Sequence, residues 1–220
     1  MTAVKSKCLP TYLVIDTSLS MESHQDLLND TVEHVFTVIG DNPRVSEFAH
    51  LSVVTFSTAP HVVLEMSDIE HVTEIPVLEC SGSTNYGPLF SLLRQRIDQD
   101  VEQLNAGGRR AVLRPAVFIL TDGEPMDQNW TGPLAALVDR GWRRYPHIIS
   151  YGFGDANEAV LGQIATRMAF LAVNVEREKE AIVSMMTSLL KTLVESAGAD
   201  EFRIPTEVPG YRTVPVEIIE

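Results

Sequence analysis

Short apolar runs with the character of buried strands alternate along this chain with segments whose apolar residues recur at helical spacing. The strand-like runs cover residues 12–15, 50–56, 116–120, 147–151 and 170–173. The helical patterns cover residues 28–39, 89–104, 134–142, 160–168 and 182–194. Strands that are apolar on both faces and separated by amphipathic helices predict an open, mostly parallel sheet with helices on both faces. The expected fold class is therefore Rossmann-like α/β.

One strand is expected to run against the others. Residues 61–66 form a further strand-like run, and only a short connection through Ala59 and Pro60 separates it from residues 50–56. A connection of this length suits a hairpin, because a parallel pair needs a crossover of a dozen or more residues. We therefore expect one antiparallel edge strand.

Local patterns mark several helix ends. Gly40, followed by Asp-Asn-Pro, ends the pattern of residues 28–39, and the pair Gly107 and Gly108 ends that of residues 89–104. Ser23 and Asp26 have the spacing of a capping box, which predicts a helix start at that point.

The length of 220 residues, 45% of them apolar, suits one substantial domain. We expect this domain to cover residues 1–196. The character changes in residues 197–220, where apolar residues alternate with polar residues or proline and Pro209-Gly210 predicts a turn. This C-terminal extension is expected to be a hairpin, a docking arm or a disordered terminus.

The charge balance excludes several partner classes. The chain carries 17 basic and 30 acidic residues, a formal net charge of −13, which disfavours nucleic acid and anionic membranes as partners. No apolar run approaches the ~20 residues that span a bilayer, and the first ten residues lack a signal-peptide pattern. Cys8 and Cys80 are far apart and are expected to be reduced thiols. The chain therefore reads as cytoplasmic, with a cationic partner or a metal as its ligand.

Three separated loops offer oxygen ligands. Asp16, Ser18 and Ser20 directly follow the first apolar run, Asp122 follows the run of residues 116–120, and Thr84 lies in a polar loop between them. In open α/β sheets, ligands bind beyond the carboxyl ends of the strands where strand order reverses. If the strands before Asp16 and Asp122 are central neighbours, the two carboxylates meet at that point.

Carboxylate and hydroxyl oxygens without His or Cys suit a hard cation such as Mg²⁺ rather than Zn²⁺, with Mn²⁺ or Ca²⁺ as further possibilities. Ser18, Ser20 and Thr84 would supply neutral oxygens, and Asp16 and Asp122 would ligate directly or hold metal-bound waters. Each loop alone also has the composition of a helix cap or a turn. The three loops together, at matching strand ends, favour the metal site.

These motifs resemble the von Willebrand factor type A domain. Its metal-ion-dependent adhesion site has the pattern Asp-x-Ser-x-Ser, a distant Thr and Asp-Gly, which Asp16, Ser18, Ser20, Thr84 and Asp122 match in order. The resemblance covers roughly residues 10–196. Leu-Pro-Thr-Tyr-Leu-Val-Ile-Asp-Thr-Ser and Thr-Asp-Gly-Glu-Pro-Met-Asp are most similar to bacterial tellurium-resistance Y-type proteins.

The resemblance implies a binding function. An Asp or Glu of a protein partner would complete the coordination of the metal, and the assembly would belong to a stress response of the tellurium-resistance type, with protein kinase or phosphatase components as possible partners. Leu19 departs from the family, in which many members have Gly, and its side chain is expected to point away from the metal.

An enzyme and a dinucleotide-binding module are the alternatives to an interaction module. A metal-dependent hydrolase or phosphatase could use the same site, but Ser18 stands where a dehalogenase-type phosphatase has its second carboxylate, and no Gly-x-Ser-x-Gly elbow occurs. Gly152 and Gly154 resemble part of a dinucleotide-binding loop that lacks its third glycine, and a tight strand-to-helix connection is the favoured interpretation. We expect no enzymatic activity.

Four further residues lie near the predicted site in the sequence. His24, which follows Ser20 closely, is expected to face solvent. Glu124, Asp127 and Trp130 follow Asp122 and could surround the metal face. For Trp130, packing and contact with a partner are equally expected.

Overall fold

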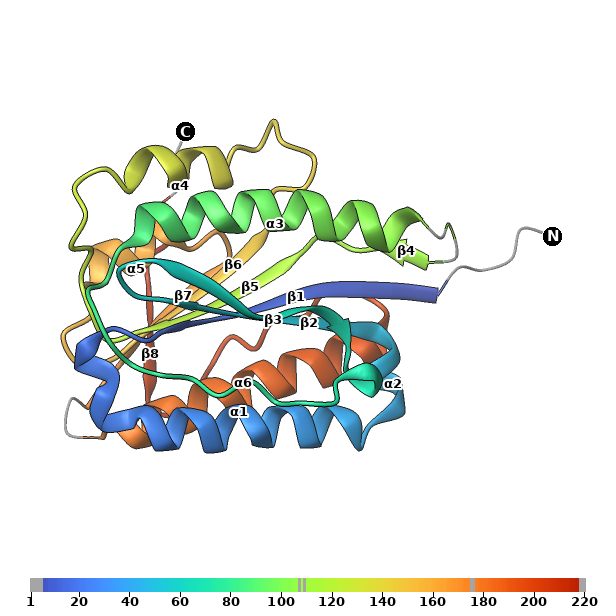
Figure 1. Ribbon diagram of the computed structural model, residues 1–220, viewed down its shortest axis with the longest axis horizontal. Coiled ribbons are helices and arrows are strands. Elements are labelled where there is room, and N and C mark those ends of the chain that lie inside the picture. The colour runs from blue at the N-terminus through green and yellow to red at the C-terminus, as the bar shows by residue number, and fades with distance from the viewer. Residues whose placement is uncertain (1–5, 107, 109, 175–176, 218–220) are drawn as a thin grey trace.

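A single sheet forms the centre of the molecule. The computed structural model describes residues 6–217 except 107, 109 and 175–176. The strands are β1 (Ser6–Asp16), β2 (Ala49–Phe56), β3 (Pro60–Asp68), β4 (Arg110–Val112), β5 (Ala116–Thr121), β6 (His147–Gly152), β7 (Met168–Ala172) and β8 (Tyr211–Val214). Their order is β3-β2-β1-β5-β6-β7-β8, and β4 pairs with the first residues of β1 (Figure 1).

Most neighbouring strands are parallel, as the sequence predicts. The central pairs β2-β1, β1-β5, β5-β6 and β6-β7 are all parallel. The predicted antiparallel edge strand is β3, which pairs with β2. A second antiparallel edge is formed by β8 against β7. The expected α/β fold class is confirmed, with one more antiparallel strand than predicted.

The strand β8 comes from the predicted C-terminal extension. Pro209 and Gly210 precede it as a turn, and Tyr211 to Val214 pair with β7 rather than with a second strand of the extension. Residues 1–5 and 218–220, the outer ends of the two predicted segments, lie outside the described residues. The division into residues 1–196 and 197–220 therefore stays a prediction.

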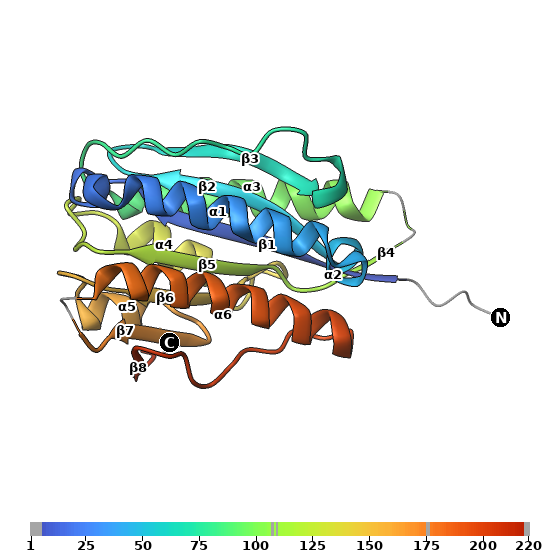
Figure 2. The same ribbon diagram turned by 90° about the horizontal axis from the view of Figure 1, so that it is seen from below.

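Helices cover both faces of the sheet. One face is covered by α1 (Gln25–Gly40), α2 (Pro43–Phe48) and α6 (Glu178–Ala199), and Figure 2 shows α1 and α6 side by side. The other face is covered by α3 (Tyr86–Ala106), α4 (Thr131–Leu137) and α5 (Glu158–Ile164). Side chains alternate along β1, so that Leu13 packs toward α1 and α6 while Val14 packs toward α3.

The start of α1 differs from the prediction. A 3₁₀ turn, η1 (Leu19–His24), precedes the helix, and α1 begins at Gln25. The N-cap residue of α1 is His24, and its side chain makes no capping bond. The predicted capping box of Ser23 and Asp26 is therefore wrong. The helix is instead held by its apolar stripe, which is fully buried against the sheet at Leu28, Val32, Val35 and Ile39.

Two predicted helices end earlier than expected. The helix α4 ends at Leu137, because the Asp139 carboxylate accepts from Gly141 N at 2.8 Å and turns the chain before Trp142. The helix α5 ends at Ile164, and Thr166 then accepts from Ile148 N at 2.8 Å. This bond draws the chain onto the sheet, so that Met168 lies in β7 and not in a helix.

Two short elements were not predicted. Asn42 and Pro43, interpreted as a helix stop, also start α2, in which the Asn42 side chain accepts from Val45 N at 3.3 Å. The strand β4 has only three residues, too few for a periodic pattern. It follows α3, which ends at Ala106, directly before the predicted stop at Gly107 and Gly108. Of these two glycines, Gly107 lies outside the described residues.

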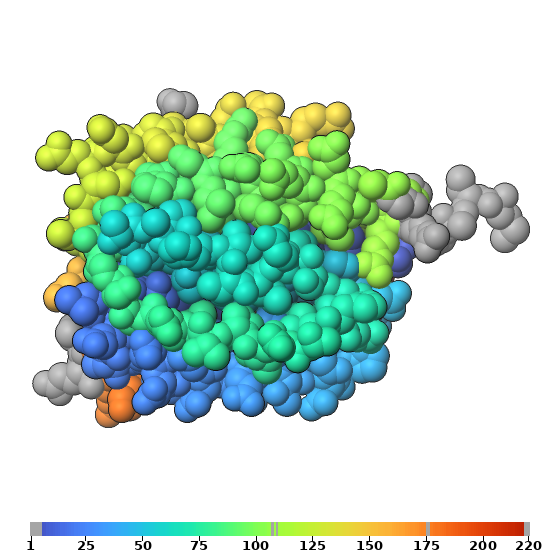
Figure 3. All heavy atoms as spheres, viewed as in Figure 1, coloured from blue at the N-terminus to red at the C-terminus, as the bar shows by residue number. Residues whose placement is uncertain are grey.

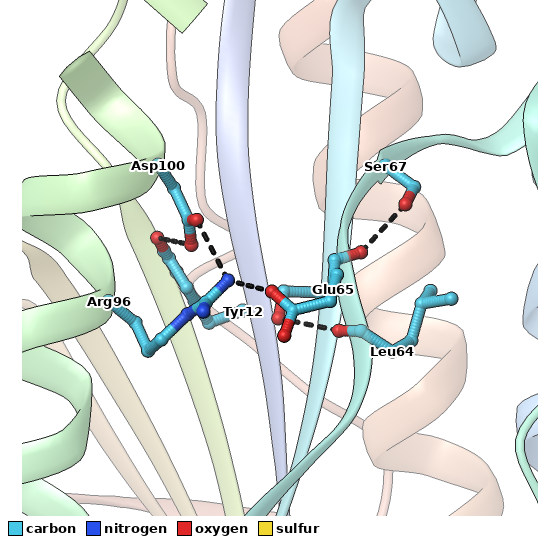
Figure 4. A network of polar contacts seen from close by, with 7 residues as sticks. Tyr12, Leu64, Glu65, Ser67, Arg96 and Asp100 are labelled. Atoms are coloured by element: carbon cyan, nitrogen blue, oxygen red, sulfur yellow. Dashed lines mark hydrogen bonds and ion pairs between the residues drawn. The ribbon is translucent and has the colours of Figure 1, made fainter. Parts of the chain in front are cut away.

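The edge strand β3 closes one side of the molecule. Figure 3 shows β3 and residues 69–85 as a continuous band between α3 and α1. A buried polar network holds this edge (Figure 4): the Tyr12 hydroxyl donates to Asp100 at 2.8 Å, and Arg96 bonds to both Asp100 and Glu65 of β3. Among the described residues, no helix is long and apolar enough to cross a membrane.

Candidate metal centre

The predicted oxygen donors lie at the carboxyl edge of the sheet, where strand order reverses. The chain leaves β1 toward β2 on one side, and it leaves β5 toward β6 on the other. The pairing of β1 with β5 confirms the adjacency on which the predicted meeting of Asp16 and Asp122 depends. Asp16 is the last residue of β1, and Asp122 directly follows β5. This arrangement is the switch point at which open α/β sheets bind ligands.

The carboxylate of Asp16 is buried and fixed at both oxygens. Its Oδ1 accepts from Ser18 N at 2.9 Å, and its Oδ2 accepts from the Thr121 hydroxyl at 2.6 Å. Thr121 in turn accepts from the Tyr86 hydroxyl at 3.0 Å and from Gly123 N at 3.2 Å. These bonds orient Asp16 without any cationic side chain.

A second run of hydrogen bonds joins the first and third loops. Ser20 Oγ donates to Asp122 Oδ1 at 2.9 Å. The two oxygens Ser18 Oγ and Ser20 Oγ lie 3.1 Å apart, so the hydroxyl of Ser18 donates to Ser20. Leu19 between them is 61% exposed, which confirms that its side chain points away from this cluster.

Thr84 approaches the same cluster from the second loop. A methyl group added at Gly123 would lie 3.1 Å from Thr84 Oγ1, so the glycine leaves the space that this hydroxyl occupies. The loop is tied to the first loop by two backbone bonds, Leu19 N to Gly82 O at 3.0 Å and Ser81 N to Thr17 O at 2.7 Å. The three predicted loops are thus brought together.

Two residues that position this cluster, Thr121 and Tyr86, were given no role from the sequence, and a third, Asp127, has a role other than the expected one. Thr121 and Tyr86 connect to Asp16 as described above. Asp127 was expected near the metal face, but its two oxygens accept from Tyr86 N at 2.9 Å and Gly87 N at 2.8 Å. It therefore caps α3 and joins the third loop to the second. The pairing of a carboxylate with a helix 40 residues earlier leaves no local pattern in the sequence.

The residues around the cluster form an open cleft. It is lined by Ser20, Ser23, His24, Thr84, Asp122, Gly123, Glu124, Met126, Gly154, Asp155 and Glu178. The expectation that His24 faces solvent is wrong, because its ring is 7% exposed, bonds to Glu178 of α6 at 2.8 Å and packs edge-on against Phe153. Trp130 packs against Tyr86 and Phe90, so its role in the structure is packing.

The electrostatics of the cleft favour a bound cation. Burial raises the pKa of Asp16 to about 6, although the hydrogen bonds from Thr121 and Ser18 oppose this rise. Burial also raises the pKa of Asp122, and Glu178 adds to the effect, whereas the Ser20 hydrogen bond and His24 oppose it. Neither carboxylate forms an ion pair within the described part of the chain. A divalent cation would stabilise both as anions.

The donor set fits a hard cation. The hydroxyls of Ser18 and Ser20 and the carboxylate of Asp122 form one hydrogen-bonded run. Thr84 lines the same cleft as Ser20 and Asp122, and Asp16 accepts from Ser18 N. Hard divalent ions prefer oxygen ligands. Across the described ranges, no three His, Cys, Asp or Glu side chains gather as a metal site. A metal at this edge would therefore depend on the serine and threonine oxygens.

The fold and the position of these residues define a class, an open α/β domain with its ligand site at the sheet's switch point. The family model of the von Willebrand factor type A domain matches residues 11–124, more than half of the chain, and the chain belongs to this family. Proteins of this family generally serve in adhesion or protein interaction. No curated protein matches the sequence.

Several solved structures share the fold. Proximal thread matrix protein 1 from the mussel byssus, in a form with a zinc-occupied MIDAS motif, is 16% identical and has a TM-score of 0.59 over 86% of this chain and 48% of its own. The pilus adhesin SpaC of Lactobacillus rhamnosus GG is 12% identical, with a TM-score of 0.65 over 87% of this chain and 31% of its own.

A third structure is a von Willebrand factor type A protein from Catenulispora acidiphila, 15% identical, with a TM-score of 0.53 over 82% of this chain and 43% of its own. The chain thus spans half or less of the length of each of these proteins. At these identities the likeness concerns the fold alone.

Proposed function

We propose that this chain is a metal-dependent protein-interaction module whose metal ligands are Asp16, Ser18, Ser20, Thr84 and Asp122. The observation that carries the proposal is the hydrogen-bonded run from Ser18 through Ser20 to Asp122. It gathers oxygens of the first and third loops beside two carboxylates that lack a cationic partner among the described residues. A cation that binds this cluster in the folded chain would stabilise the fold, because it offsets the negative charges of the two carboxylates.

Mg²⁺ is the proposed ion, and Mn²⁺ or Ca²⁺ would suit the same oxygens. When bound, the ion supplies a coordination position that an external carboxylate can fill. The chain's own residues prepare the site: Thr121 orients Asp16, and Gly123 leaves room for the Thr84 hydroxyl. The hydroxyls of Ser18 and Ser20 can offer lone pairs to an ion while their protons remain in the hydrogen-bonded run.

The proposed partner is a protein that presents an Asp or Glu to the metal. The resemblance to tellurium-resistance Y-type proteins supports a cytoplasmic stress-response assembly, with kinase or phosphatase components as candidate partners. Leu19 and Met126, 61% and 71% exposed, offer apolar contacts beside the donors. A partner carboxylate next to an apolar side chain would match this edge.

Affinity capture from native lysate tests the proposal, with wild type, Thr84→Ala and Ser83→Ala as baits. We expect partners that are retained with Mg²⁺ by wild type and Ser83→Ala, and that are released by chelator or by Thr84→Ala. Equal retention under all conditions would rule out the metal-dependent mechanism. If the protein hydrolysed phosphoesters or peptides with Mg²⁺, and Asp16→Ala abolished this activity, the chain would be a hydrolase and not an interaction module.

A further inference from the structure

Arginines gather at the edge of the sheet opposite the proposed metal ligands. Arg114 lies two residues before β5, and Arg167 lies directly before β7. Arg140 and Arg143 lie in the loop that leads into β6. All four are exposed. We call these four residues the arginine surface.

Backbone and ring contacts bring together the segments that carry these arginines. His147 N donates to Pro115 O at 2.8 Å, and Arg167 N donates to Ile148 O at 3.1 Å, so the starts of β5, β6 and β7 lie side by side. The Arg114 guanidinium carbon lies 4.6 Å from the centre of the Tyr145 ring. Both Arg114 and Arg167 also help to lower the pKa of His147, after burial, which is the largest cause.

The charges of the arginine surface are not neutralised internally. Its four arginines form no ion pair in the part of the chain that the structure describes. Arg144 of the same loop differs, since it pairs with Asp98 at 3.0 Å. The same loop and hollow carry two carboxylates, Asp139 and Glu217, so the four arginines leave a local excess of positive charge in a chain whose net charge is −13. It attracts anions that the rest of the molecule repels.

A small hollow lies within the same edge. Its lining is mixed: Val138, Ala165 and Val216 are apolar, Arg140, Tyr145, Gln163 and Thr166 are polar, and the one carboxylate is Glu217. The apolar residues offer a contact for a small apolar side chain, and Glu217 repels a carboxylate at this point. The exposed guanidinium groups around it favour carboxylates, which arginine binds with paired hydrogen bonds.

We propose that the arginine surface binds an acidic segment of a partner protein, in which Asp and Glu residues flank one apolar side chain that enters the hollow. A protein segment is favoured over nucleic acid, because Glu217 in the hollow repels a phosphate group and the net charge of the chain repels a long polyanion. This interaction does not depend on the metal ligands, which lie at the other end of the strands.

Fluorescein-labelled heptapeptides test the proposal by anisotropy at low salt. Each has three acidic residues on either side of a central Leu, Phe or Ala. We expect binding that weakens with salt, that is tighter for Leu than for Ala and that gains nothing from Phe over Leu, because the hollow is small. Arg143→Glu combined with Arg167→Glu should weaken it at least tenfold. Thr84→Ala should bind the peptides like wild type.

A matched variant separates the arginine surface from net charge. Lys179→Glu combined with Lys191→Glu reverses two charges on α6, outside the arginine surface, and should retain wild-type affinity. Melting temperatures establish that each variant is folded. The proposal is overturned if wild type binds none of the peptides, if both double variants weaken binding equally, or if a single-stranded oligonucleotide of equal charge binds more tightly than the Leu peptide.

Discussion

The hydroxyl of Thr121 at the end of β5 donates a 2.6 Å hydrogen bond to Oδ2 of Asp16 at the end of the neighbouring strand β1. Thr121 itself accepts from Tyr86, the first residue of α3. One bond therefore links the two strands at the switch point, and the next links them to the helix that follows the Thr84 loop. The position of Asp16 depends on a residue that is not one of the proposed ligands.

Replacing Thr121 with valine keeps its shape and removes this bond. The pKa of Asp16 should then rise above its value of about 6, because the bond stabilises the carboxylate. We expect Mn²⁺ affinity to fall by about tenfold, the size of effect seen when a ligand loses its orienting partner. Isothermal titration calorimetry measures it. Tyr86→Phe, which leaves the Thr121 bond to Asp16 in place, should have a smaller effect.

The metal-free protein should lose stability as the pH rises from about 4 to about 6. The folded pKa of Asp16 is raised to about 6 from the ordinary 3.8, so the unfolded chain loses its proton first and deprotonation favours unfolding. The contribution is roughly 3 kcal/mol at most. Asp122 acts in the same direction. Urea unfolding in chelator, at the two ends of this range, should show a fall that is clearly smaller in Asp16→Asn.

Thr84→Ala should weaken metal binding without unfolding the protein. The hydroxyl lies in the donor cluster, and its loss removes one of the neutral oxygens. We expect at least a tenfold fall in Mg²⁺ or Mn²⁺ affinity by calorimetry and the loss of the metal-induced rise in melting temperature. Ser83→Ala removes the neighbouring hydroxyl and should behave like wild type. Equal losses in the two variants would point to a general change of the loop.

Gly123→Ala tests the space beside Thr84. The added methyl would lie 3.1 Å from Thr84 Oγ1, closer than ordinary contact, so the hydroxyl must shift. Metal affinity should fall while the melting temperature of the metal-free protein changes little. Gly132→Ala is the control, because a methyl at that position meets no atom within 4 Å. If Gly123→Ala binds metal normally, the Thr84 hydroxyl is not a ligand.

Asp100 holds the polar network of Figure 4 and should matter far more to stability than Asp98 on the same helix. Asp100 is 2% exposed and bonds to both Tyr12 and Arg96. Its replacement by alanine leaves the buried Tyr12 hydroxyl without its partner and removes one of the two carboxylates that bond to Arg96, and it should cost about 3 kcal/mol. Asp98 pairs with Arg144 on the surface, and Asp98→Ala should cost about 1 kcal/mol or less. Chemical denaturation compares the two.

Much of this architecture could be predicted from local patterns. Residues 12–15 before Asp16 and residues 116–120 before Asp122 are continuous apolar runs, which identify strands buried on both faces. The six residues of β1 before Tyr12 lack this pattern and were not predicted. Their adjacency needed an assumption about strand order, because periodicity says nothing of which parallel strands are neighbours. The pairing of β1 with β5 confirms that assumption.

The rest depends on contacts between distant segments. His24 is a polar residue of a kind typical of the surface, yet its ring bonds to Glu178 of α6, which lies 154 positions further along the chain. Asp127 caps a helix that begins 41 positions earlier. Trp142 continues a helical spacing, but Asp98 bonds to its ring nitrogen at 3.2 Å and holds it outside α4. None of these bonds has a local sequence pattern.

Crystals soaked in MnCl₂ and measured for anomalous scattering give the most direct test of the proposed site. We predict one strong peak within coordination reach of the side-chain oxygens of Ser18 and Ser20, and the loss of that peak in Thr84→Ala or Asp16→Ala. A difference map with no peak at the carboxyl edge of β1 and β5 at saturating Mn²⁺, or with its main peak elsewhere, would contradict the account.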